Sequence, residues 1–226
     1  MYHVKYEYKE IVAQATYKFW KNELTGGGDG GDISLLDTVD NLIYILPRPN
    51  KYLSIPDWSV IRPDHVVVMD REGNMIEDNG LLPTVEWPTH VHIYNARKDA
   101  KAIVHSHGQW SSVFAITGKS IPVCLAEQAL FLGGETVCAE YGLVGSQDLG
   151  EKIVAALGKT RSTALMRNHG AVAIGSSLED ALTKAILLEK GAQTTIFGSL
   201  IGKPIVLEMD NILDDCLLDE NGNPNF

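Results

Sequence analysis

Cysteine, long apolar runs and positive charge are all scarce in this sequence, and each shortage excludes a class of protein. The three cysteines, Cys124, Cys138 and Cys216, form neither a CxxC pair nor a disulfide framework, which fits the reducing cytosol. No run of about 18 or more apolar residues occurs, and the first residues lack the apolar stretch of a signal peptide. Lys and Arg number 19 against 29 Asp and Glu, a net charge of −10 that argues against nucleic acid or an anionic membrane as the partner. We therefore expect a soluble cytoplasmic protein.

The 226 residues are enough for one α/β or α+β domain with a full core and an internal site. Neither an internal repeat nor an interdomain linker is found, so we expect a single domain over residues 1–226. Its tail, from about residue 208, is acidic and rich in Asn and Gly, and we expect it to be a loose end.

Helical and extended segments alternate irregularly along the chain. Apolar spacing and caps predict helices over about 6–24, 88–95 and 110–116, and after the caps Ser146 and Ser177. Short apolar runs predict strands over 33–36, 42–46, 66–69, 102–107, 164–166 and 172–174. The connections between strands near both termini are too short for βαβ crossovers. We therefore predict a mostly antiparallel sheet covered by helices.

Two histidines separated by one residue end the predicted strand 102–107. Alternate residues of a strand share one face, so the rings of His105 and His107 converge on one point, as a metal requires. His169 lies in a turn between two predicted strands. Three neutral imidazoles would leave an open coordination position on Zn²⁺ or a similar ion, which is typical of a catalytic site. The alternative is a strand end with one buried and one solvated histidine.

The pair His90 and His92 has the same spacing but lies in a predicted helix. Residues two apart in a helix point about 200° away from each other around the axis, so this pair cannot chelate one ion. We expect His90 near the site and His92 in packing or at the surface. Glu86 precedes the same helix, where its carboxylate is either a helix cap or a group that reaches a metal or transfers a proton.

A glycine-rich segment, residues 26–31, satisfies the pattern G-x-G-x-x-G literally. It follows a predicted helix and precedes a strand, which is the reverse of the dinucleotide-binding context, and it lacks the GK[ST] of a P-loop. Two interpretations stay open: a backbone that offers N–H groups to an anionic group, or a simple loop.

Together these motifs resemble the class II aldolase and adducin family. Residues 86–97 follow E-x-P-x-H-x-x-I-Y-x-x-R, residues 102–107 follow A-[IV]-V-H-[ST]-H, and residues 168–170 are N-H-G. Residues 30–34 match the family's G-G-N-I-S loop with Asp32 in place of Asn. The resemblance extends from about Tyr6 to about Pro204. It implies a three-layer α/β/α fold around a mostly antiparallel sheet, and a homotetramer with active sites between neighbouring subunits.

The resemblance also implies a chemistry. It assigns Zn²⁺, or Mn²⁺ or another divalent cation, to His105, His107 and His169, and it makes Glu86 the catalytic acid/base. We expect a metal-dependent lyase that cleaves a C–C bond of a sugar-like hydroxy-carbonyl compound by retro-aldol chemistry, through a metal-stabilised enediolate. A decarboxylase or a 4-epimerase would use the same chemistry and stays open. A non-catalytic adducin-like module is a remote alternative, because the metal histidines are all present.

Departures from the family pattern concern the substrate. Phosphate-using members carry a Ser-Gly pair before the 66–69 strand, where this chain has residues 53–58, and P-S-S-E where this chain has residues 83–86. Asp32 would repel a phosphate dianion at pH 7 unless a cation such as Arg48, Lys51 or Arg62 compensates. We therefore predict weak phosphate binding and an unphosphorylated small-molecule substrate. The predicted substrate-binding residues are Gly30, Gly31, Asp32, Thr84 and Val85.

A further departure concerns a proton donor. Where some members have a tyrosine before a Gly-Gly pair, reaching into the neighbouring subunit's site, the aligned residue here is Glu127. We predict Glu127 as a second catalytic residue if burial raises its pKa, and an interface salt bridge is the alternative. Tyr141 is a weaker substitute.

Overall fold

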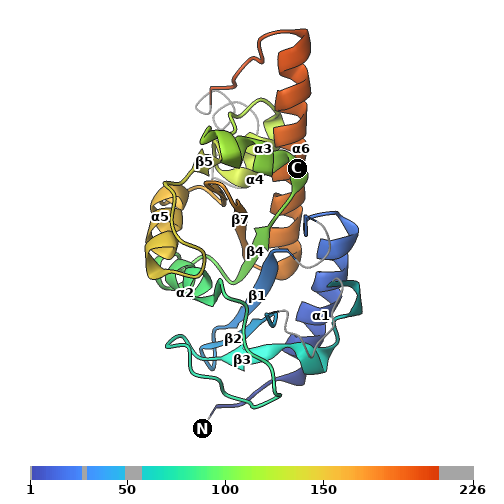
Figure 1. Ribbon diagram of the computed structural model, residues 1–226, viewed down its shortest axis with the longest axis vertical. Helices are drawn as coiled ribbons and strands as arrows, with labels where there is room; N and C mark the ends of the chain where they lie inside the picture. The colour runs from blue at the N-terminus through green and yellow to red at the C-terminus, as the bar shows by residue number, and fades with distance from the viewer. Residues whose placement is uncertain (1, 27–29, 49–57, 209–226) are drawn as a thin grey trace, which may run out of the picture.

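The computed structural model describes residues 2–26, 30–48 and 58–208 (Figure 1). Cys216 and the tail that the sequence predicts to be loose lie outside these residues, apart from Glu208. The described chain contains six α-helices and seven strands. In chain order they are α1 (Tyr6–Lys21), β1 (Asp32–Asp37), β2 (Leu42–Ile45), β3 (Val67–Met69), α2 (Trp87–Ala96), β4 (Ala102–Ser106), α3 (Gln109–Thr117), α4 (Ala126–Leu132), β5 (Val137–Cys138), α5 (Gln147–Leu157), β6 (Thr163–Met166), β7 (Gly170–Gly175) and α6 (Leu178–Ile201).

The strands form one mixed sheet in the order β3-β2-β1-β4-β7-β6-β5. Every pair of neighbours is antiparallel except β5 and β6. The predicted strands 33–36 and 42–46 pair as the hairpin of β1 and β2, and the predicted turn between β6 and β7 forms, because short connections allow only antiparallel pairing. The mostly antiparallel sheet expected from the sequence is therefore confirmed.

Helices cover both faces of the sheet and make three layers (Figure 1). Side chains of α2 and α5, such as Ile93 and Ile153, share one core with one face of the strands. Side chains of α1 and α6, such as Phe19 and Leu182, share a second core with the other face. Strand β4 lies in the middle of the sheet and is buried along its whole length. The strand end that carries the paired histidines is therefore held by neighbours on both sides.

Local signals in the sequence explain where several elements begin. The Ser146 hydroxyl accepts a hydrogen bond from the Leu149 N–H at the start of α5, and Ser177 does the same for Asp180 at the start of α6. Both predicted caps are thus confirmed. α4 and β5 were not predicted from the sequence, because they have only seven and two residues. Within the described ranges, no helix combines the length and the apolar character that crossing a membrane requires.

Candidate metal centre

The three histidines singled out from the sequence lie together at one end of the central strands. His105 is in β4, His107 follows that strand, and His169 lies in the turn from β6 to β7. Their ring centroids are 4.8 to 4.9 Å apart in all three pairings. One ligand nitrogen of each ring lies within 4.8 Å of the others, so the group could hold a metal ion. The antiparallel pairing of β4 with β7 brings the distant turn beside the strand end.

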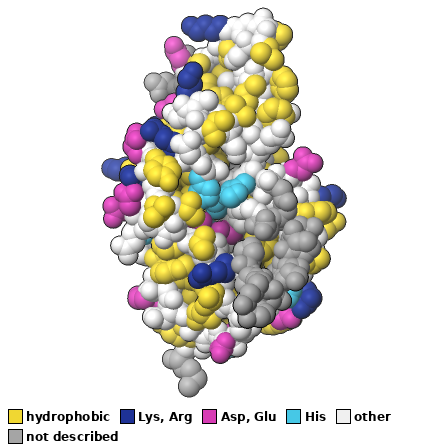
Figure 2. All heavy atoms as spheres, viewed as in Figure 1, with side chains coloured by type: hydrophobic (Ala, Val, Ile, Leu, Met, Phe, Trp, Pro, Cys, Tyr) yellow, Lys and Arg dark blue, Asp and Glu magenta, His cyan; other side chains and the backbone are white. Residues whose placement is uncertain are grey.

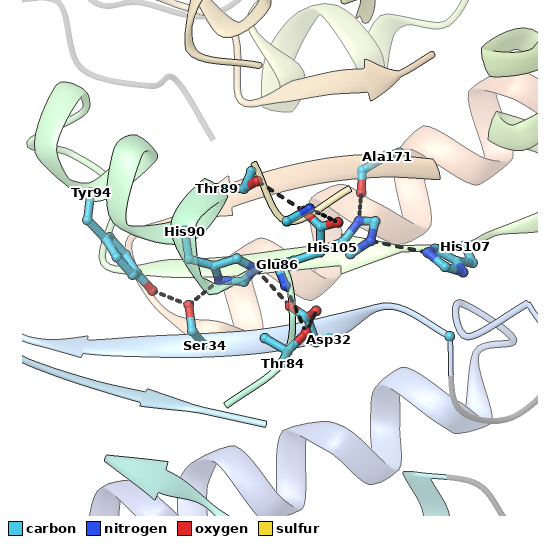
Figure 3. Close-up of polar contacts among 12 residues, drawn as sticks. Asp32, Ser34, Thr84, Glu86, Thr89, His90, Tyr94, His105, His107 and Ala171 are labelled. Atoms are coloured by element: carbon cyan, nitrogen blue, oxygen red, sulfur yellow. Dashed lines mark hydrogen bonds and ion pairs between the residues drawn. The ribbon is translucent and has the colours of Figure 1, made fainter. Parts of the chain in front are cut away.

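The hydrogen bonds of His105 aim its second nitrogen at the centre of this group. Its Nδ1–H donates to the carbonyl of Ala171 at 3.1 Å, which leaves the lone pair on Nε2 (Figure 3). That Nε2 lies 3.1 Å from the Nε2 of His107. A hydrogen bond from the ring nitrogen that does not face the metal fixes the tautomer and orientation of a metal-ligating histidine.

Burial keeps the rings of His105 and His169 uncharged. It lowers the pKa of His105 to about 4, and together with the nearby His107 it lowers the pKa of His169 to about 4. Both rings are therefore neutral near pH 7, as ligation requires. Nδ1 of His169 is buried and has no hydrogen-bond partner among the described residues. Two neutral rings, a third ring beside them and this buried nitrogen without a partner fit a divalent cation.

Glu86 lies at the edge of this group, directly before α2. The residue is 3% exposed, and its side chain makes no cap hydrogen bond to the helix. Its Oε2 accepts from the Thr89 hydroxyl at 3.0 Å, its Oε1 accepts from the Gly145 N–H at 3.2 Å, and Oε1 lies 3.9 Å from Nδ1 of His169. Burial, with a contribution from the charge of Asp32, raises the pKa of Glu86 to about 7. The carboxyl can therefore gain or lose a proton near neutral pH.

Asp32 is a buried carboxylate on β1, opposite His105 in the strand register. Its Oδ2 accepts from the Thr84 hydroxyl at 2.6 Å, and its Oδ1 lies 2.8 Å from Nε2 of His90 (Figure 3). Burial alone would raise the pKa of Asp32, but His90 and Thr84 outweigh it and lower the pKa to about 2. Asp32 is thus ionised at neutral pH, accepts the Thr84 hydroxyl and lies in ion-pair contact with His90.

A chain of buried polar groups continues from His90 into the core. Nδ1 of His90 lies 2.7 Å from the Ser34 hydroxyl, which lies 2.7 Å from the Tyr94 hydroxyl (Figure 3). These contacts link α2 to β1. His90 lies near the site, as the sequence predicts, whereas Ser34 and Tyr94 were not predicted as its partners. Their spacing was a usable signal, since Tyr94 is four residues after His90 on one helix and Ser34 two residues after Asp32 on one strand.

The paired histidines of α2 separate as the helical spacing predicts. His90 faces β1, whereas Nδ1 of His92 contacts the carbonyl of Pro88 at 2.9 Å, and the His92 ring packs beside Gly150 of α5. They do not share a ligand position.

The described part of the glycine segment packs its backbone against the histidines. A side chain at Gly30 would collide with the ring of His107, and one at Gly31 with the carbonyl of His105. Thr84 is buried against Asp32, and the Val85 side chain is about half exposed. Among the cations considered, Arg48 donates to the carbonyl of Pro83 at 3.3 Å. Arg62 pairs with Asp64, while Lys51 and residues 27–29 and 53–57 lie outside the described residues.

Glu127 lies on α4, exposed, and pairs with the Lys190 ammonium at 2.9 Å. That hydrogen bond lowers the pKa of Glu127, so the raised pKa that the predicted role requires is not present in this chain. Tyr141 is about half exposed.

The histidine group reaches the surface. Figure 2 shows histidine side chains in the middle of one face, where the surface is hollowed. A groove of about 1140 Å³ begins at His107 and runs between the end of α1, the start of α3 and the middle of α6. Its lining includes Trp20, Gln109, Trp110 and Glu189. A substrate bound at the histidines therefore has room to extend.

Comparison with known proteins gives the family. The family model for the class II aldolase and adducin N-terminal domain matches residues 10–196, and the chain belongs to this family. The fold is that of the class II aldolases, as the resemblance implied.

Individual relatives are named as aldolases. L-fuculose phosphate aldolase of Escherichia coli K12 is 34% identical over 153 residues, 68% of this chain and 70% of that protein. 5-Deoxy-D-ribulose 1-phosphate aldolase of Bacillus thuringiensis serovar kurstaki is 29% identical over 212 residues, 91% of this chain and 93% of that protein. A solved structure of L-fuculose 1-phosphate aldolase superposes with a TM-score of 0.84 at 28% identity, covering 92% of this chain and 94% of that one.

Proposed function

We propose that this protein is a metal-dependent, aldolase-type lyase that cleaves a C–C bond of a hydroxy-carbonyl compound by retro-aldol chemistry. One observation carries the proposal: three imidazoles converge on one point, and the carboxyl of Glu86, with a pKa of about 7, lies 3.9 Å from one of them. The names of the aldolase relatives support the same reaction class.

His105, His107 and His169 would hold the ion, and we propose Zn²⁺ because it favours imidazole nitrogen and leaves a position open in catalytic sites. When bound, such an ion stabilises negative charge on the substrate's oxygen atoms as a Lewis acid. The remaining chemistry belongs to side chains of the protein.

Proton transfers complete the proposed cleavage. The substrate hydroxyl loses its proton to a second base, the role proposed below for Glu127, the C–C bond breaks to release an aldehyde, and the carbon next to the carbonyl of the other fragment takes up a proton. We assign this last transfer to Glu86, because its two hydrogen bonds hold the carboxyl beside the histidines and burial keeps its pKa near neutral. Glu86→Gln should therefore retain the metal and lose turnover.

We propose that the substrate carries no phosphate, although the relatives cited are named for phosphorylated sugars. A phosphate beside Thr84 would meet the ionised Asp32, which already holds the Thr84 hydroxyl. An uncharged polyhydroxy compound avoids this repulsion. Gly30, Gly31 and Val85 would complete this side of the substrate site.

We further propose a homotetramer, in which a neighbouring chain completes each site. Exposed apolar side chains near the end of α6, including Phe197, Leu200 and Ile201, support association. In that assembly Glu127 would act as the second acid/base, provided that contact with the neighbour separates it from Lys190 and buries it. Glu127→Gln that leaves turnover unchanged would remove it from the mechanism.

A turnover screen tests the reaction and the substrate class together. Zinc-loaded protein is incubated with paired free and phosphorylated ketoses, and aldehyde and CO₂ release are scored separately. Glu86→Gln serves as the inactive variant, and Glu179→Gln, which alters an exposed carboxylate in the first turn of α6, serves as the control. Aldehyde release from free ketoses supports the proposal. CO₂ release would indicate a decarboxylase, and efficient cleavage of the phosphorylated ketoses alone would contradict the substrate class.

A further inference from the structure

The helix that follows His107 begins without a cap of its own. α3 starts at Gln109, and its N-cap residue is Gly108, which has no side chain. The first N–H groups of any helix lack partners within the helix and need acceptors from elsewhere. At α3 these groups belong to the turn that directly follows a proposed metal ligand.

Glu189, from the middle of α6, supplies the acceptors. One carboxylate oxygen accepts from the N–H of Trp110 at 2.8 Å and the other from the N–H of Ser111 at 3.0 Å. Both oxygens are thus used on two successive backbone groups. A carboxylate at a helix N-terminus is also favoured by the helix dipole.

Gly108 and Glu189 fit each other closely. A side chain at Gly108 would collide with the Glu189 carboxylate, whereas the backbone there has φ −56°, which any residue adopts. The glycine is therefore required by the carboxylate and not by the backbone conformation.

The backbone of His107 is fixed from both directions. On its N-terminal side, the His107 N–H donates to the carbonyl of Leu24 at 2.8 Å. On its C-terminal side, Glu189 holds the turn. α6 spans 24 residues, and its side chains share a core with β4 and β7, so Glu189 projects from a well-packed support.

We propose that Glu189 is a positioning residue for the metal: it holds the turn after β4 so that the His107 ring points at His105 and His169. The inference rests on the proposed metal site and concerns how one of its ligands is aimed. Mutation of a residue that orients a metal ligand without touching the metal typically weakens metal binding 10- to 100-fold.

Cobalt binding to the full-length, metal-stripped chain tests this inference. Co²⁺ is titrated into wild type, Glu189→Gln, Glu189→Ala and Glu179→Gln, with the visible absorption band as the readout, and thermal unfolding of the metal-free proteins is measured in parallel. We expect both Glu189 variants to bind Co²⁺ at least about tenfold more weakly and the Glu179 control to match wild type. A fall in unfolding temperature with unchanged Co²⁺ affinity would show a structural role only and overturn the inference. Absence of Co²⁺ binding in wild type would instead refute the metal site itself.

Gly108→Ala adds a second, independent test. In wild type, the added methyl group should displace the carboxylate and weaken Co²⁺ binding about as much as Glu189→Ala does. In the Glu189→Ala background the collision is gone, so Gly108→Ala should cost nothing further. Additive losses would show that the two residues act separately and would contradict the inference.

Discussion

Replacing Glu86 by Gln should stabilise the metal-free protein at alkaline pH. Glu86 is 3% exposed, and its pKa is raised from an ordinary 4.5 to about 7 by burial and by the charge of Asp32. Between these pH values the unfolded chain has lost the proton that the folded chain keeps. Stability therefore falls as pH rises from about 4.5 to about 7 and stays lower above it. The difference corresponds to about 3 kcal/mol.

Denaturant unfolding with a chelator present, at one protein concentration and at several values from pH 5 to pH 8, measures this effect. The free energy of unfolding of Glu86→Gln should lack the decline attributed to Glu86, so that its advantage over wild type grows to about 3 kcal/mol by pH 8. Glu179→Gln, which alters an exposed carboxylate, should run parallel to wild type. If the curves of wild type and Glu86→Gln are parallel across this range, the carboxyl does not have the raised pKa on which its proposed role depends.

Three further predictions address the substrate, the position of the acid and a helix cap. Asp32→Asn should raise the ratio of kcat/KM for phosphorylated over free ketose by about tenfold, because it removes a negative charge; an unchanged ratio would show that Asp32 does not select the substrate. Gly145→Ala should lower kcat much more than Gly80→Ala, because the Gly145 N–H holds the Glu86 carboxyl. Both glycines have φ near +75°, but only at Gly145 would the added carbon meet a backbone oxygen, that of Val85, at 2.7 Å. Equal effects on kcat would show that the Gly145 backbone does not position Glu86. Ser146→Ala should cost about 1 kcal/mol of unfolding free energy, and no loss would mean that the cap is dispensable.

The sequence predicts the histidine group because its signals are local. Alternation along β4 and the residue that follows it puts His105 and His107 on one side, and the glycine after His169 marks a tight turn. Neither signal says that the turn and the strand end meet. That depends on the pairing of β7 with β4, for which the resemblance to a family was needed.

The supporting contacts depend on tertiary packing and could not be predicted. Glu189 reads as one more acidic residue on a long helix, and only the packing of α6 against α3 brings it to the backbone after His107. Gly145 donates to Glu86 from a loop 59 residues away. The lowering of the pKa of Glu127 could not be predicted either, because its partner Lys190 lies on another helix.

The position of a bound metal ion tests the central claim most directly. Crystals soaked with Co²⁺ or Zn²⁺ and measured at the absorption edge of that metal should show one anomalous peak per chain, among the ring nitrogens of His105, His107 and His169, with at least one coordination position not filled by histidine. A peak elsewhere, no peak at these rings, or an ion whose ligands from the protein leave no open position would contradict the account.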